Sequence, residues 1–208
     1  MKYEWRKTEK QRYIPKQKPE LIQVPKMKFI TISGSGNPNG ETFKSHIEAL
    51  YGPAYAIRML NKSENPPADY FEYIVYPLEG IWDLSDKAKA SGIFDKNELV
   101  YKIMIRQPDF VTPELFDYAI TTSKSKKDNP LYDEVVFEEI EDGLCVQMLH
   151  VGSYDDEAKT FEVMQKFIDD NHLELTTKVH REIYLSDFRR VAPEKLKTVL
   201  RYFVKHKS

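Results

Sequence analysis

The sequence predicts an α+β fold built from two similar halves, each with the order strand, helix, strand, strand. Segments with the two-residue hydrophobic alternation of strands and segments with helical periodicity follow one another in this order twice. Residue identity between the halves is low, so the internal repeat depends on element order and pattern. Two such halves predict antiparallel sheets around a central ligand groove. The aligned segments are 29–50 with 145–168, 73–79 with 181–187, and 100–107 with 199–206.

Three strands are expected in the first half. Residues 27–40 begin as a short strand and continue into a loop rich in Gly, Asn and Pro. Residues 70–82 alternate as a strand that Pro77 and Gly80 end or bulge, because proline removes a donor from the sheet and glycine weakens it. Residues 99–108 form the third strand.

Two helices are expected before the second half begins. Residues 42–60 place apolar side chains at helical spacing, and Gly52-Pro53 should break or bend this helix. Residues 112–127 form the connecting helix, with Thr112 as its N-cap followed by a proline in the first turn. The lysine-rich end of this helix complements the helix dipole.

The second half repeats the order of the first. Residues 144–156 have the pattern of a strand followed by a loop, and residues 157–171 that of an amphipathic helix. Residues 179–187 alternate as a strand. The last strand falls within residues 194–206, after one helical turn that begins at Pro193.

We expect these elements to form one domain over residues 1–208. The N-terminal arm carries eight Lys/Arg against three Asp/Glu and is expected to lie extended on the domain. A nucleic-acid-binding arm is the alternative for this segment. The expected parts are the arm (1–26), the first half (27–110), the connecting helix (111–130) and the second half (131–208).

Composition argues against several classes of protein. Hydrophobic residues make up 41% of the chain and aromatic residues 12%, which is enough for a packed core. The net charge of -2 argues against a nucleic-acid-binding protein, and the apolar runs are too short to span a membrane. A single cysteine, Cys145, suits a reducing cytoplasm, where we expect the protein to act. The histidines lack metal-ligand spacing, so we expect neither metal nor cofactor.

Glu182 and Tyr184 are the principal candidate site residues. Their strand alternates, so both side chains share one face while Ile183 points to the other. A strand centre disfavours glutamate. In the internal alignment the apolar residue Ile74 takes the place of Glu182, and a purely structural strand has no need of that asymmetry.

The position of Glu182 has two explanations. Its side chain either faces solvent or pairs with an arginine such as Arg58 or Arg106, or it lies in a pocket. In an aromatic pocket, desolvation raises the pKa of a carboxyl group and makes it a competent general base. A carboxylate that stays ionised there is instead a counter-ion for a cationic ligand, aided by cation–π contacts.

Further aromatic and acidic residues are candidates for the same pocket. Tyr76 aligns with the tyrosine of the second-half strand, so both hydroxyls could donate to a substrate oxygen that gains charge. Trp82 could form a pocket wall and Glu79 could reach the rim, because both follow the expected bulge. Core packing, or for Glu79 a solvated turn, is the alternative. The remaining wall candidates are Tyr55 and Phe188.

The element order, the run Glu-Ile-Tyr-Leu-Ser-Asp at 182–187 and the closing segment from Pro193 resemble the GyrI-like small-molecule-binding domain. The longer run at 71–82 is similar to the stand-alone branch of that family. The resemblance covers residues 27–208. It implies a tandem strand–helix–strand–strand fold whose groove binds hydrophobic, often cationic, aromatic molecules, with Glu182 in the place of a groove-floor glutamate. The family also provides the drug-binding part of multidrug-sensing regulators, but no DNA-binding domain is recognisable in this sequence.

Some stand-alone members hydrolyse DNA-alkylating natural products that carry a cyclopropane ring. The resemblance therefore implies detoxification of hydrophobic, cyclopropane-bearing alkylators by a cofactor-independent hydrolase in which Glu182 activates water. Tyr76 or Tyr184 would hydrogen-bond the charge that develops on the substrate carbonyl. The alternative is a non-catalytic protein that binds or senses planar hydrophobic or cationic drugs. A protein-interaction module is a third hypothesis, although no charged patch in the sequence singles out a partner.

Overall fold

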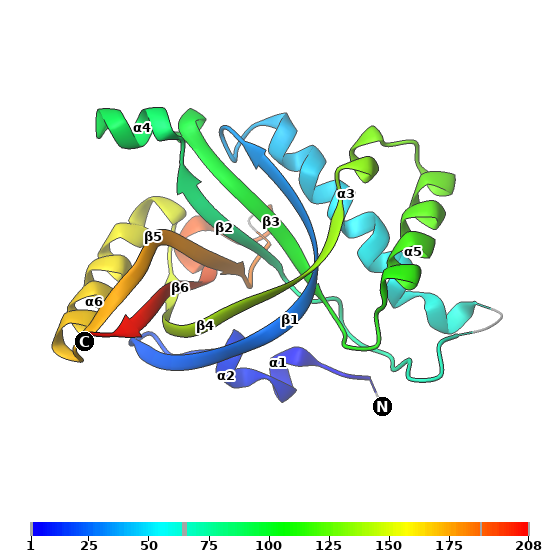
Figure 1. Ribbon diagram of the computed structural model, residues 1–208, viewed down its shortest axis with the longest axis horizontal. Helices are drawn as coiled ribbons and strands as arrows, with labels where there is room; N and C mark the ends of the chain where they lie inside the picture. Colours follow the sequence, from blue (N-terminus) through cyan, green and yellow to red (C-terminus); the bar gives the residue numbers. More distant parts are fainter. Residues whose placement is uncertain (1, 64–65, 188, 208) are drawn as a thin grey trace. The chain divides into compact units, whose positions relative to one another are not determined.

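The computed structural model describes residues 2–63, 66–187 and 189–207, and its strands pair in antiparallel fashion (Figure 1). Neighbouring strands follow the order β1-β3-β2-β5-β6-β4. The α+β class and the antiparallel pairing expected from the alternation are confirmed. The strands are β1 (Glu20–Ser35), β2 (Leu78–Leu84), β3 (Leu99–Gln107), β4 (Val136–Val151), β5 (Leu173–Tyr184) and β6 (Lys197–His206).

Helices occupy most of the remaining ordered segments. The N-cap expected for the connecting helix is present, because the side chain of Thr112 accepts a hydrogen bond of 3.3 Å from the backbone N–H of Leu115. The α-helices are α1 (Trp5–Thr8), α2 (Lys10–Tyr13), α3 (Glu41–Arg58), α4 (Asp86–Ser91), α5 (Pro113–Lys126) and α6 (Glu157–Asp170). Single turns of 3₁₀ helix are η1 (Leu60–Lys62), η2 (Lys96–Glu98), η3 (Pro130–Asp133), η4 (Tyr154–Asp156) and η5 (Pro193–Lys195).

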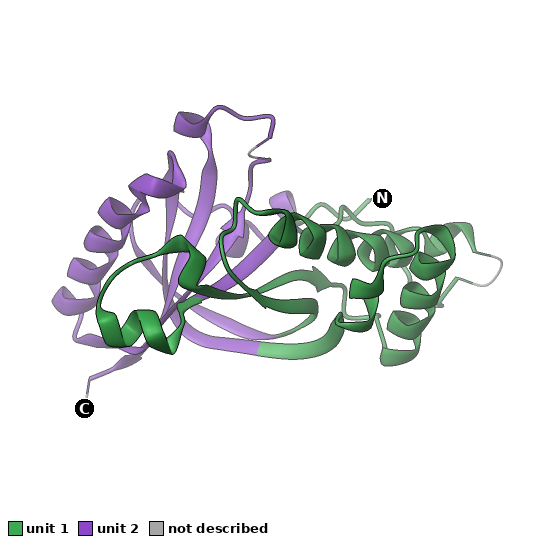
Figure 2. Cartoon of the chain, turned by 90° about the horizontal axis from the view of Figure 1, so that it is seen from above, with its two compact units in different colours: residues 1–5, 27–76, 83–140 green, residues 6–26, 77–82, 141–208 purple. Residues whose placement is uncertain are grey.

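The chain divides into two compact units that interleave along the sequence (Figure 2). Strands β1, β2 and β4 each have one end in unit 1 and the other in unit 2. Unit 1 comprises residues 1–5, 27–76 and 83–140, and unit 2 comprises residues 6–26, 77–82 and 141–208.

Unit 1 combines a strand pair with two helices. Strands β1 and β3 pair with Ile30 opposite Ile105, and both side chains are buried. Helices α3 and α5 pack side by side (Figure 1). Leu50 and Ile57 lie two turns apart on α3 and are buried, as the apolar stripe of an amphipathic helix requires.

Unit 2 contains the paired strands β2, β5, β6 and β4, with helix α6 alongside β5 and β6 (Figure 1). Met164 and Ile168 lie one turn apart on α6 and pack against Val146 and Leu200 of the sheet. The register places Glu182 opposite Leu200 on the neighbouring strand. Because directly paired residues share a face of a sheet, Glu182 lies on the face that α6 covers.

Helix α3 runs in one piece through Gly52-Pro53, so of the expected break or bend the break is wrong. A Cβ atom on Gly52 would lie 2.5 Å from the hydroxyl of Tyr132, and the glycine therefore serves the close approach of that side chain. Pro53 and Ala54 are both buried. Tertiary packing of this face holds the helix despite the missing backbone donor.

Strand β2 begins only at Leu78, whereas the alternation predicted a strand from residue 70. The rings of Tyr70 and Tyr73 pack against Phe110 with centroid distances of 5.3 and 6.2 Å. The alternation of residues 70–77 therefore reflects the packing of aromatic rings rather than a long strand. Strands β1 and β4 are conversely longer than expected, with 16 residues each.

Candidate functional site

The carboxylate of Glu182 is the centre of a hydrogen-bonded group on β5. Glu182 is 9% exposed. Its Oε1 lies 2.9 Å from Nε2 of His180, and its Oε2 accepts a hydrogen bond of 2.8 Å from the hydroxyl of Tyr184. Hydrogen bonds to both oxygens fix the carboxylate and stabilise its negative charge.

The alternation of β5 brings these three side chains together. Residues 180, 182 and 184 project to one face, and Arg181 and Ile183, each 1% exposed, project to the other. The shared face expected for Glu182 and Tyr184 is confirmed by their hydrogen bond. The partners of Glu182 are thus its strand neighbours, while Arg58, one of the arginines considered as its partner, pairs with Glu72 in unit 1 at 2.8 Å.

Trp82 continues this group from the neighbouring strand. The pairing of β2 with β5 places Trp82 opposite His180 and Gly80 opposite Glu182. The indole Nε1 of Trp82 donates a hydrogen bond of 2.7 Å to the hydroxyl of Tyr184. A Cβ atom on Gly80 would lie 2.7 Å from that Nε1 and 3.3 Å from that hydroxyl, so only glycine leaves room for the contact.

The hydroxyl of Tyr184 is committed to Glu182. Burial raises the pKa of this hydroxyl well above its ordinary value, and the negative charge of Glu182 raises it further. The group therefore stays a neutral phenol and donates its proton to the carboxylate. The indole of Trp82 donates to the hydroxyl of Tyr184, and this hydroxyl donates to the carboxylate of Glu182, so the three side chains form one hydrogen-bonded chain.

Glu157 is a second carboxyl group of this site that sequence reasoning missed. It is the first residue of α6 and is 7% exposed, and its Oε1 has no hydrogen-bond partner among the described residues. Burial, followed by the negative charges of Glu182 and Asp155, raises the pKa of Glu157 to about 10. A glutamate in the first turn of a helix is usually solvent-exposed and interacts with the helix dipole. The burial of Glu157 is therefore visible only in the tertiary structure.

Aromatic side chains surround the two carboxyl groups. The ring of Tyr154 packs edge-on against Tyr184 with a centroid distance of 5.9 Å, and burial raises the pKa of Tyr154 to about 12. The ring of Phe161, on α6, lies 4.8 Å from the ring of His180 and 4.9 Å from that of Tyr202. Tyr154 and Phe161 were also missed, because Tyr154 falls in a loop and Phe161 reads as ordinary helix core.

Glu79 lies on the other face of the sheet. It pairs with Ile183 in the register, and its Oε2 accepts a hydrogen bond of 2.9 Å from Arg181. Glu79 and Arg181 are both buried; burial raises the pKa of Glu79, and the positive charge of Arg181 opposes this. The buried ion pair corrects both expectations for Glu79, the pocket rim beside Trp82 and the solvated turn.

Tyr76 and Tyr55 belong to unit 1, whereas the Glu182 group belongs to unit 2. Tyr76 is buried, with the guanidinium carbon of Arg106 lying 4.7 Å from its ring centroid. Tyr55 is 55% exposed on α3 and lines a cavity of about 170 Å³ near α5. Phe188 lies outside the described residues. The roles of these three residues in ligand binding stay predictions.

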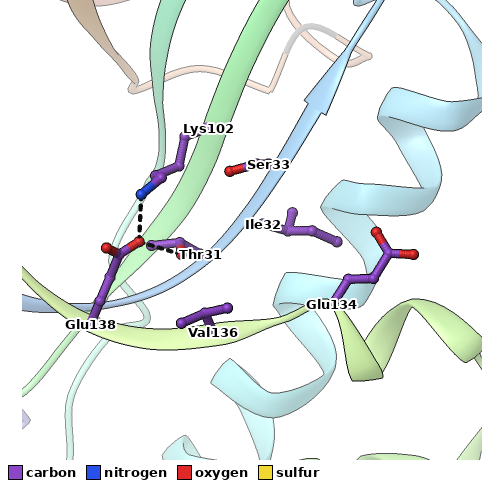
Figure 3. Close-up of a pocket in the computed structure, with 7 residues that line it drawn as sticks. All are labelled: Thr31, Ile32, Ser33, Lys102, Glu134, Val136 and Glu138. Atoms are coloured by element: carbon purple, nitrogen blue, oxygen red, sulfur yellow. Dashed lines mark hydrogen bonds and ion pairs between the residues drawn. The ribbon is translucent and has the colours of Figure 1, made fainter.

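Unit 1 has a cavity of about 340 Å³ beside β1, β3 and β4 (Figure 3). Lys102 and Thr31 donate hydrogen bonds of 2.8 and 2.7 Å to the same oxygen of Glu138. Burial raises the pKa of Glu138, but these two donors outweigh it and the net pKa is lowered. This acidic group is neutralised by its neighbours, in contrast to the carboxyl groups of Glu157 and Glu182.

The fold and the aromatic-lined carboxylate define the chain as a small-molecule-binding domain. Its sequence matches the family model of the GyrI-like small molecule binding domain over residues 17–207, and the chain belongs to that family. The resemblance noted in the sequence and the GyrI-like fold are thereby confirmed.

Solved structures extend the comparison. The chain is 38% identical to an uncharacterized conserved protein from Listeria innocua, with a TM-score of 0.90, 98% of this chain covered and 100% of that one. It is 37% identical to a hydrolase from the same organism, with a TM-score of 0.88 and the same coverage. The EcmrR C-terminal domain, at 16% identity, a TM-score of 0.53, and 91% and 98% coverage, shares the fold.

No curated protein matches the sequence. Among the helices that the structure describes, none is long and apolar enough to cross a membrane. Within the same described residues, no group of three or more His, Cys, Asp or Glu is arranged to hold a metal ion.

Proposed function

We propose that the protein hydrolyses hydrophobic, cyclopropane-bearing alkylating compounds, with Glu182 as the general base. The observation that carries this proposal is a buried carboxylate that His180 and Tyr184 fix on an aromatic face. The Listeria innocua hydrolase, similar over the full chain, supports a hydrolytic activity.

In the proposed reaction the oxygen of a water molecule attacks a ring carbon, and Glu182 accepts a proton from this water. The strained carbon–carbon bond breaks, and its electron pair moves into the conjugated carbonyl, which becomes a phenol once it receives a proton. The product is the substrate plus one water. Relief of ring strain supplies the driving force, so the reaction as proposed needs no cofactor. The aromatic rings hold a flat substrate in place, and this orientation lowers the barrier.

Tyr184 has a different role from the one expected at first. Its hydroxyl already donates to Glu182 and accepts from Trp82, so it acts as a positioning residue for the base. Tyr76 remains the other predicted donor to the substrate oxygen, and the contacts of unit 2 do not test this role.

A second candidate function follows from the same carboxylate. An ionised Glu182 beside Tyr154 and Trp82 suits a planar aromatic cation, because cation–π attraction adds to the charge–charge attraction. The protein would then bind or sense such compounds without changing them.

The cytoplasmic location that the single cysteine predicts belongs to the proposal as well. Cys145 is buried and forms no disulfide, and burial raises the pKa of its thiol to about 12.

Glu182→Gln distinguishes the two candidates. Wild type and variant are incubated with a spirocyclopropyl cyclohexadienone alkylator, mass spectrometry follows the addition of one water, and tryptophan quenching follows binding. We expect the variant to bind and to lose hydrolysis by about 100- to 10,000-fold, the usual contribution of a general base.

Glu174→Gln is the matched control, because Glu174 lies on the same strand in a partly exposed pair with Lys205. This variant should hydrolyse at the wild-type rate. If wild type binds the compound and returns it unchanged, the protein is a binder and the catalytic proposal is wrong. If Glu182→Gln hydrolyses as fast as wild type, Glu182 is not the base.

A further inference from the structure

We infer that Glu157 is the general acid of the same site: its carboxyl group gives a proton to the substrate carbonyl oxygen while Glu182 accepts one from water. This inference rests on the proposed hydrolysis. It assigns a chemical role to a residue that lies 25 positions away from Glu182 in the sequence, on α6 rather than on the sheet.

The two carboxyl groups have different hydrogen-bonding surroundings. Glu182 has a partner for each oxygen, at 2.9 and 2.8 Å. Glu157 is buried, and its Oε1 has no partner among the described residues. A buried carboxylate without donors is costly, while the neutral acid costs much less. The environment therefore favours the protonated form of Glu157.

The charges around Glu157 act in the same direction. Glu182 on β5 and Asp155 on η4 both disfavour a second negative charge there, in addition to burial. The partial positive charge of the α6 N-terminus opposes them only weakly, at about 0.3–1 kcal/mol. At neutral pH Glu157 therefore holds its proton. Other titratable side chains near this end of α6 include Asp156, Tyr154, Tyr184 and His150.

The proposed chemistry needs a proton donor that Tyr184 does not supply, because its hydroxyl is engaged by Glu182. Two carboxyl groups with different surroundings are a general pattern for an acid and a base at one site. Glu157 fits the acid, because its Oε1 has no hydrogen-bond partner among the described residues and is not committed to another group.

The complete step is balanced. Water loses a proton to Glu182 and forms a carbon–oxygen bond to the ring carbon. The ring carbon–carbon bond breaks, its electrons move to the carbonyl oxygen, and that oxygen takes the proton of Glu157. A proton then returns from Glu182 to Glu157, directly or through water, which restores both groups.

The test compares wild type with Glu157→Gln in the same hydrolysis assay, across pH and with two alkylators whose product phenols differ in acidity. We expect Glu157→Gln to bind the compound but to lower kcat by about 100- to 10,000-fold at pH 7. The loss should be smaller for the more acidic product phenol, which needs protonation less. We also expect kcat of wild type to decrease at alkaline pH, as the acid loses its proton, and this decrease should be absent from the variant.

Glu162→Gln is the matched control, since Glu162 lies exposed on the same helix. It should keep the wild-type kcat and pH profile. An active wild type with an equally active Glu157→Gln overturns the acid role and leaves the hydrolysis intact. Equal losses for both alkylators indicate positioning and likewise overturn proton transfer. An inactive wild type removes the hydrolysis itself, and the acid role with it.

Discussion

Glu157 and Glu182 carry the same functional group, and their surroundings separate their behaviour. The carboxylate of Glu182 lies between His180 and Tyr184. Glu157 is buried with an unpartnered oxygen and faces negative neighbours. Hydrogen-bond donors stabilise the charged form, whereas desolvation and like charge favour the neutral one. Substituting one member of the pair at a time separates their contributions.

The protonation of Glu157 predicts a specific dependence of stability on pH. Its pKa is raised to about 10 in the folded protein from an ordinary value of 4.5. Between these values the folded state holds more protons than the unfolded state, so this stabilising contribution is complete below pH 4.5 and is lost as pH rises toward 10. The loss from this group is up to about 1.4 kcal/mol per pH unit.

Glu157→Gln removes this titration. We expect the free energy of unfolding of the variant, measured by urea denaturation from pH 5 to pH 9, to fall less with pH than that of wild type. The difference between the two should therefore grow steadily with pH. Glu162→Gln should follow the wild-type curve. Parallel curves for wild type and Glu157→Gln would show that Glu157 is ionised in the folded state at neutral pH.

At the scale of elements, the neighbouring strand β2 positions the base from the side. Gly80 faces Glu182 across the strand pair, and its missing side chain allows Trp82 to reach Tyr184. The indole then orients the phenol that orients the carboxylate. The site therefore depends on two neighbouring strands in one register, since a shift by one residue would place these side chains on the opposite face.

Gly80→Ala tests this arrangement. The added methyl group would lie 2.7 Å from Nε1 of Trp82, so the indole must move and the hydrogen bond to Tyr184 is lost. We expect a stability loss of about 1–3 kcal/mol from overpacking and a marked decrease of kcat. Trp82→Phe removes the same donor without adding volume and should lower kcat with a smaller loss of stability. Wild-type kcat in both variants would show that the indole does not position the site.

At the scale of the whole molecule, the sequence predicted the fold class and the shared face of Glu182 and Tyr184. Period-two alternation and the repeated element order predicted the α+β class, and alternation alone predicted that Glu182 and Tyr184 share a face. Glu157 was missed because its burial depends on how α6 packs against β5, which local pattern does not record. Glu79 was misplaced because residues 79–82 pair with β5 in a regular register, which puts Glu79 on the face opposite Trp82.

A cluster of buried charges lies behind the site and ties the strands of unit 2 together. Asp142 accepts hydrogen bonds of 2.6 Å from Arg181 and 3.3 Å from Arg201, and its side chain is 2% exposed. Arg201 also donates to the side-chain oxygen of Gln147 at 2.9 Å. The carboxylate of Asp142 on β4 thus accepts from Arg181 on β5 with one oxygen and from Arg201 on β6 with the other, and it links the three strands.

Asp142→Asn leaves Arg201 buried without its ion-pair partner, while Arg181 keeps only its pair with Glu79. Removing one partner of a buried ion pair costs about 3–5 kcal/mol, because the remaining charge stays desolvated. We expect a loss of that size in the free energy of unfolding, measured by urea denaturation. Asp170→Asn breaks an exposed pair with Lys166 and should cost less than about 1 kcal/mol. If the two variants lose the same small amount, water reaches the cluster and the charges behind the site do not hold the sheet together.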